Sequence, residues 1–376
     1  MFSTIKDLGY KYVPILALSP SEMVAYEELP NKEKDLILPL FPLKGWSSSK
    51  ELDNSIDRID KSVGQRPWIA DIDGSFLSGN KEFMLTGKYP RPVFEQIAAL
   101  SDPSNGYDNW FQYVKGLPNS IPVVQLTDLS QLRIQYINLL SLQRGVVLRI
   151  PMNDVRASDL QYIVSVVKDF ESKDLLVIFD YGDINAEALA FIEQYSLLLR
   201  RFYSELKGGL YSVSSTSFPY SFPGTYRGEL PIYERRLYRK VLKECEEVDM
   251  IYSDRGSTRA GKLTGGAGTP PPRIDYPLRD DWRFIRKEFG DPKNISESEK
   301  LRIYREIARE IMTSDYWQNG LRLWGTQMIE RTSFGDEYGI TSPNRATAVR
   351  INIHLYQQLH YNDPLDQLDT DEDWED

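Results

Sequence analysis

The chain has 376 residues, of which 41% are hydrophobic and 12% aromatic, and its net charge is −10. These values are typical of a folded globular protein and exclude a disordered chain. The single cysteine, Cys245, excludes an intrachain disulfide and favours a reducing, cytoplasmic location. The sequence has no apolar run long enough to span a membrane, and its first residues lack the pattern of a secretion signal.

Short apolar runs alternate with helical patterns over the first two thirds of the chain. The runs predict strands that are buried on both faces, and they cover residues 11–18, 35–41, 67–73, 121–127, 145–151, 175–180, 209–215 and 250–254. Helical patterns follow seven of the eight runs. This rhythm predicts an α/β fold, a (β/α)8 TIM-type barrel that covers residues 1–256. A doubly wound open sheet is the alternative, but it usually opens on a glycine-rich turn that this chain lacks.

The rest of the chain has a different composition. Residues 257–361 begin with a basic loop rich in glycine and proline and continue with helical patterns at 296–312, 325–331 and 343–359, which predict a helical extension packed on the barrel. Residues 362–376 form an acidic tail that we expect to be disordered. From Asp363 to Asp376 there are eight acidic residues and no basic one, and without them the net charge of the chain is only −2. The acidity is therefore local and predicts a separate role for the tail.

The carboxyl ends of the predicted strands carry several acidic side chains. In barrels of this kind the reactive face lies at these ends. The candidate catalytic residues are Asp71, Asp73, Asp180 and Asp254. Converging carboxylates would suit a divalent cation such as Mg²⁺ or an acid–base pair. The structural alternative is that these aspartates cap the helices that follow, or form ion pairs such as Arg149–Asp180.

Basic residues near the same strand ends are candidates for binding an anion: Arg149, Arg255 and Lys262. Arg255, Arg259, Lys262 and Arg273 stand in a stretch, residues 255–273, that contains no acidic residue. Such a loop could close over an anion or receive the acidic tail. The near-neutral body and the acidic tail give nucleic-acid binding no support from net charge. The two histidines, His354 and His360, both lie in the last predicted helix, so the strands offer no histidine metal pair and no Ser–His–Asp triad.

The opening pattern Tyr12-Val-Pro-Ile-Leu16, followed by Ile37-Leu-Pro-Leu-Phe41, resembles the start of the beta-protein family of phage and bacterial proteins. Trp324 and Arg350-Ile-Asn-Ile-His354 continue the resemblance near the end of the chain. It implies a barrel and an association with phages or with bacterial mobile or defence islands. No catalytic residue comes with the resemblance.

Two hypotheses for function follow. In the first, which rests on the resemblance, a phage- or anti-phage-defence-associated protein binds a macromolecular partner, most simply a protein. The acidic tail is then a contact, with Leu365, Leu368 and Trp374 interleaved among its acids. In the second, the strand ends form the site of a metal-assisted hydrolase or another enzyme that acts on a nucleotide or phosphate ester.

Overall fold

A computed structural model describes residues 5–170, 174–222, 225–261, 270–291 and 294–364 of the chain. The chain divides into two compact units, which are taken separately below. The first consists of Met1–Ser19, Asp35–Thr216 and Tyr233–Arg255. The second consists of Pro20–Lys34, Ser217–Ile232 and Gly256–Asp376.

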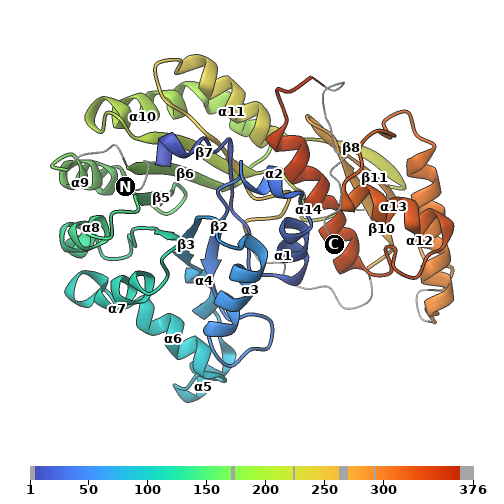
Figure 1. Cartoon of the computed structure of the whole chain (residues 1–376), viewed down its shortest axis with the longest axis horizontal. Coiled ribbons are helices and arrows are strands. Elements are labelled where there is room, and N and C mark those ends of the chain that lie inside the picture. Colours follow the sequence, from blue (N-terminus) through green and yellow to red (C-terminus); the bar gives the residue numbers. More distant parts are fainter. Residues whose placement is uncertain (1–4, 171–173, 223–224, 262–269, 292–293, 365–376) are drawn as a thin grey trace. The chain divides into compact units, whose positions relative to one another are not determined.

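Parallel strands form the centre of the first unit (Figure 1). They are β1 (Tyr12–Pro14), β2 (Leu40–Leu43), β3 (Trp68–Ile72), β4 (Ser120–Pro122), β5 (Val146–Pro151), β6 (Leu175–Asp183), β7 (Leu210–Thr216) and β9 (Tyr252–Asp254). The sheet orders are β1-β9, β2-β3-β4 and β5-β6-β7. Each of these strands overlaps one of the predicted apolar runs, although β2 and β4 share only residues 40–41 and 121–122 with theirs. Such runs satisfy their backbone in a ladder while burying both faces.

The predicted closed barrel was wrong. In the described part of the first unit the parallel strands form separate sheets of two or three strands each. Neighbouring sheets meet at isolated bridges, such as Val123–Val147, instead of continuous ladders. A physical reason is strand length, since β1 and β4 have only three residues each and end at Pro14 and Pro122. A proline nitrogen has no hydrogen to donate, so these short strands offer few backbone groups for a ladder to a second neighbour.

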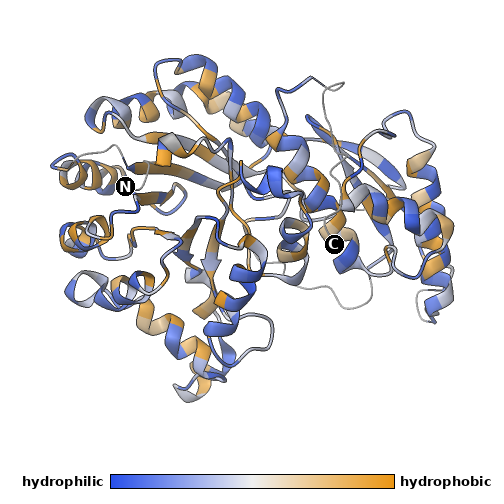
Figure 2. Cartoon of the chain, viewed as in Figure 1, coloured by the Kyte–Doolittle hydropathy of each residue, from blue (hydrophilic) through white to orange (hydrophobic). Residues whose placement is uncertain are grey.

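Helices flank these strands along the first unit (Figure 1). They are η1 (Ile5–Leu8), α3 (Asp53–Val63), α4 (Gly74–Leu77), α5 (Lys81–Thr86), α6 (Pro92–Leu100), α7 (Ser104–Lys115), η2 (Leu129–Gln131), α8 (Leu132–Leu140), α9 (Ala157–Val167), η3 (Ala186–Phe191), α10 (Ile192–Glu205) and α11 (Tyr233–Glu244). Many are amphipathic; α3, for example, buries Ile56, Ile59 and Val63 at helical spacing. The strands are mostly hydrophobic, whereas the helices show mixed faces (Figure 2).

The second unit contains a sheet that the sequence did not predict. Its three antiparallel strands lie in the order β10-β11-β8. The strands are β8 (Arg227–Pro231), β10 (Arg273–Pro277) and β11 (Asp281–Arg286), and the helices are α1 (Pro20–Glu27), α2 (Asn31–Lys34), α12 (Glu297–Met312), α13 (Trp324–Phe334) and α14 (Pro343–Leu359). The expected extension of helices alone was therefore incomplete. β11 alternates charged and apolar residues, which is typical of a strand with one buried face and differs from the continuous apolar runs of the first unit.

Helix α14 lies in the interior of the second unit, and nearly all of its residues from Ala346 onward are buried. Its buried polar side chains are held by specific partners. Asn352 donates to the carbonyl of Ala25 at 2.9 Å, and His354 Nδ1 accepts a hydrogen bond from Trp282 Nε1 at 3.3 Å. These bonds offset the cost of removing the polar groups from water. No helix in the described part of the chain is long and apolar enough to cross a membrane.

Candidate functional site

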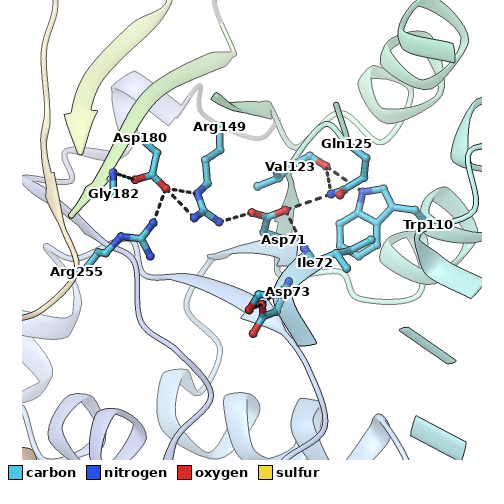
Figure 3. Close-up of polar contacts among 11 residues, drawn as sticks. Asp71, Ile72, Asp73, Trp110, Val123, Gln125, Arg149, Asp180, Gly182 and Arg255 are labelled. Carbon is cyan, nitrogen blue, oxygen red and sulfur yellow. Dashed lines mark hydrogen bonds and ion pairs between the residues drawn. The ribbon is translucent and has the colours of Figure 1, made fainter. Parts of the chain in front are cut away.

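Four of the predicted site residues meet near the ends of the parallel strands in the first unit. Asp71 lies in β3, Arg149 in β5 and Asp180 in β6, while Arg255 directly follows β9. Because parallel strands end at the same edge, residues far apart in sequence come together here (Figure 3).

An unbroken chain of ion pairs connects these four residues. Arg149 Nη1 lies 2.7 Å from Asp71 Oδ2, and Arg149 Nη2 lies 2.7 Å from Asp180 Oδ2. Arg255 Nη2 lies 2.6 Å from the same oxygen of Asp180. Two arginines and two aspartates give the group no net charge. The Asp180 side chain is only 3% exposed, so this network is largely removed from water.

The surroundings fix the protonation states within the network. Burial alone would raise the pKa of Asp180, but the charges of Arg149 and Arg255 and the hydrogen bonds to its carboxylate outweigh burial and lower the pKa to about 2. Burial likewise works against the charged form of Arg149, and its two aspartate partners more than compensate, so its pKa is raised. Asp180 therefore stays ionised near neutral pH and is poorly suited to act as a general acid or base.

Further hydrogen bonds occupy the aspartate oxygens that face away from Arg149. The backbone N–H of Gly182 donates to Asp180 Oδ1 at 3.0 Å. Gln125 Nε2 donates to Asp71 Oδ1 at 3.2 Å (Figure 3). Sequence reasoning missed Gln125. The sequence did contain a signal for Gln125. It is a polar residue near the carboxyl end of the predicted strand 121–127, as the predicted site residues are in their own strands.

Asp73 has a structural role of its own. It is the N-cap residue of α4, and its Oδ1 accepts hydrogen bonds from the backbone N–H of Ser75 at 3.0 Å and from the Ser75 hydroxyl at 2.6 Å. Lys44 Nζ lies 3.8 Å from its other oxygen. Asp73 lies beside the network in Figure 3, but these contacts use its carboxylate to start a helix.

Asp254 belongs to a second buried cluster. Its carboxylate accepts hydrogen bonds from the hydroxyls of Tyr12 and Tyr252, the latter at 2.8 Å, and the two tyrosine rings stack 5.3 Å apart. The Arg235 guanidinium lies 3.4 Å from the centre of the Tyr252 ring. Burial, followed by the negative charge of Asp254, raises the pKa of both tyrosines, so they remain hydrogen-bond donors.

A divalent cation such as Mg²⁺, considered from the sequence, has no clustered ligand set in the part of the chain that the structure describes. No group of three or more histidine, cysteine, aspartate or glutamate side chains is placed there to hold a metal ion. Asp71 and Asp180 instead share Arg149 between them. Four other predicted site residues lie outside the described residues: Lys262, Leu365, Leu368 and Trp374.

Comparison with known proteins places the chain in a family. The family model described as Beta protein matches residues 12–360. The chain is also 29% identical to Protein beta of Enterobacteria phage P4 over 378 aligned positions, which cover 98% of each chain. The family match extends over nearly the whole chain and includes every residue of the ion-pair network. The chain therefore belongs to the Beta protein family.

Proposed function

We propose that this phage-associated protein acts by binding a macromolecular partner, with its acidic tail as one contact. The observation that carries the proposal is the closed ion-pair network at the strand ends. Asp71 and Asp180 are each within 2.7 Å of an arginine nitrogen. Asp73 caps a helix, and Asp254 is held by two tyrosines. The four aspartates predicted for proton transfer or metal binding are thus engaged in ion pairs and hydrogen bonds within the fold.

The charge distribution supports a partner-binding tail. Eight acidic residues lie between Asp363 and Asp376, and Leu365, Leu368 and Trp374 are interleaved with them. A segment of this composition cannot build a core of its own, but it can order on a surface that offers basic side chains and an apolar groove. A protein partner suits this mixture better than a nucleic acid, whose phosphates would repel the acidic residues.

The experiment compares the full chain with a chain that ends at Pro364. Each carries an affinity tag at its N-terminus and is expressed in bacterial cells during phage infection, then cross-linked and purified. Proteins that co-purify are identified and quantified by mass spectrometry. We expect the full chain to retain one partner at near-stoichiometric amounts, and the shortened chain to lose at least nine tenths of it.

Two further variants make the result specific. Replacing Leu365, Leu368 and Trp374 with serine keeps every charge of the tail but removes its apolar contacts, and we expect partner loss as in the shortened chain. Asp180→Asn tests the strand ends and should leave the partner bound. Retention of the partner by both tail variants would refute the proposal. So would hydrolysis of a nucleotide or phosphate ester by the full chain that Asp180→Asn abolishes while the protein stays folded.

A further inference from the structure

The second unit contains a pocket of about 370 Å³ that four arginines line. The arginines are Arg259, Arg273, Arg286 and Arg350, and Asp275 is the one acidic residue among the described residues that line the pocket. The volume of the pocket lies at the lower end of the range for small-molecule sites, roughly 300–1,000 Å³. The pocket shares no residue with the ion-pair network of the first unit.

Asp275 holds two of these arginines in place. Arg273 Nε lies 2.8 Å from Asp275 Oδ1, and Arg350 Nη1 lies 2.8 Å from Asp275 Oδ2. The side chains of Asp275 and Arg350 are each 5% exposed. Burial would raise the pKa of Asp275, but the two guanidiniums and their hydrogen bonds outweigh burial and lower it. Asp275 is therefore a fixed anion that orients two cations toward a common space.

Aromatic rings support the same two guanidiniums. The guanidinium carbon of Arg350 lies 3.9 Å from the centre of the Phe218 ring, and that of Arg273 lies 3.6 Å from the centre of the Phe222 ring. A ring stacked on a guanidinium covers its face and leaves the N–H groups in its plane to donate hydrogen bonds. The stacking thus holds the arginines rigidly, which lowers the entropy cost of binding a ligand.

The pocket has more positive charge than its own acid can neutralise. Four arginines and Asp275 leave three positive charges among the lining residues. Arg286 also pairs with Glu288 at 2.5 Å, but the Glu288 side chain is 64% exposed and does not line the pocket. Burial lowers the pKa of Arg350 to about 10, so this arginine still carries its charge at neutral pH. An anionic ligand would compensate the buried positive charge. It would also accept hydrogen bonds from guanidinium groups that no longer donate to water.

We propose that this pocket binds a phosphorylated small molecule. Guanidinium groups match the oxygens of a phosphate in pairs, and several arginines around one space are typical of phosphate recognition. Helix α14 begins at Pro343, which lines the pocket together with Thr347, so the positive end of the helix dipole adds to the attraction. Tyr220, Tyr304 and the prolines Pro270 and Pro271 complete the lining. They give an organic group attached to the phosphate an apolar and aromatic surface.

Isothermal titration calorimetry of the full chain tests this proposal with inorganic phosphate and AMP as separate probes, in a buffer free of phosphate. We expect saturable binding at one site per chain. Tighter binding of AMP would assign the pocket to a nucleotide or a similar organic phosphate, and equal binding would assign it to the phosphate group itself. Either result supports a phosphate site. The absence of binding by both probes to folded protein would overturn it.

Matched arginine variants locate the site. Arg286→Gln removes a charge that lines the pocket and should weaken binding by about ten-fold or more, as expected for loss of a charge-assisted hydrogen bond. Arg283→Gln removes the same charge from the same strand at a residue that does not line the pocket, and it should leave the affinity within about two-fold. Equal weakening by the two variants would mean that only the general charge of the unit attracts the anion, and would refute the pocket.

A third variant blocks the pocket without changing its charge. Thr347→Phe places a large ring at a lining position on α14 and should abolish binding. Thermal unfolding of each variant shows whether it is folded at the temperature of the titration. If Thr347→Phe is folded and still binds phosphate with the original affinity, the ligand lies elsewhere and the proposal is wrong.

Discussion

Arg149 donates two hydrogen bonds to one carboxylate oxygen of Asp180, from Nε at 2.9 Å and from Nη2 at 2.7 Å. The same oxygen accepts a third bond from Arg255 at 2.6 Å. Gly182 donates to the other oxygen, so both oxygens of this carboxylate are engaged by groups of the fold itself. Arg149 of β5 thus connects β3 and β6 through its ion pairs with Asp71 and Asp180.

The first prediction concerns the loss of the ion pairs that Arg149 forms. Arg149→Met leaves Asp71 without its arginine partner and Asp180 with Arg255 alone, both buried. Removing one partner of a buried ion pair typically costs about 3–5 kcal/mol, because a charge is left without compensation. We expect a fall in the free energy of unfolding near the lower end of that range, measured by urea denaturation. Arg133→Met, which breaks an exposed pair with Asp169, should cost at most about 1 kcal/mol. Similar losses for the two variants would contradict the assigned role.

The second prediction tests the coupling within the network. In the double variant Arg149→Met/Asp71→Asn, the uncompensated carboxylate of Asp71 is removed together with its partner. The double variant should therefore be more stable than Arg149→Met alone, although Asp71→Asn by itself should destabilise the protein. The four proteins form a double-mutant cycle in urea. If the losses in unfolding free energy of the two single variants simply add up in the double variant, Asp71 and Arg149 do not interact in solution.

The third prediction concerns acid pH. The pKa of Asp180 is lowered to about 2, whereas an unfolded aspartate titrates near 3.9. Its charged form therefore stabilises the fold above about pH 4, and this contribution, about 2 kcal/mol, is lost as the pH falls toward 2. We expect the difference in unfolding free energy between the original chain and Asp180→Asn to shrink between pH 5 and pH 3. A difference that stays constant over this interval would show that Asp180 titrates normally.

Local patterns in the sequence predicted the parallel strands and the ion pair, but not the way the strands associate. The run 175–180 is apolar up to Phe179, and it forms most of the buried part of β6. Arg149 and Asp180 were expected at strand ends, with their ion pair as the structural alternative to catalysis, and the pair is confirmed. Whether sheets join depends on backbone registers between distant segments, which side-chain periodicity does not encode.

The arginine pocket was only partly visible in the sequence for the same reason. Arg259 and Arg273 stood out because they belong to residues 255–273, a stretch that contains no acidic residue. Asp275 and Arg350 are 75 residues apart and are brought together by β10 and α14. Neither position is unusual within its own segment. A pairing of this kind becomes apparent only when the tertiary structure is known.

The fourth prediction concerns His360, which lies between two acids of the second unit. Nε2 is 2.6 Å from Glu33 and Nδ1 is 2.6 Å from Asp363. Burial opposes the charged imidazole, but the hydrogen bonds and charges of the two acids outweigh it and raise the pKa of His360. The resulting stabilisation is complete below about pH 6.5 and is lost as the pH rises through the raised pKa. The difference in unfolding free energy between the original chain and His360→Gln should accordingly decrease above pH 6.5. A difference that grows with pH would show that the pKa of His360 is not raised.

The last prediction concerns the close contact between α13 and α14. A Cβ atom at Gly325 would lie 2.7 Å from Ile353 Cγ1 and 2.9 Å from the carbonyl oxygen of Val349. The Gly325 N–H also donates to Asn352 Oδ1 at 2.9 Å, so the helices cannot separate without losing a buried hydrogen bond. Gly325→Ala should therefore lower the free energy of unfolding by about 1–3 kcal/mol, the usual cost of overpacking a core. At Gly320 an added Cβ would meet no atom within 4 Å, and Gly320→Ala should change stability by less than about 1 kcal/mol. Urea denaturation of the two variants provides the comparison, and a Gly325→Ala chain as stable as the original would mean that the two helices are not in close contact.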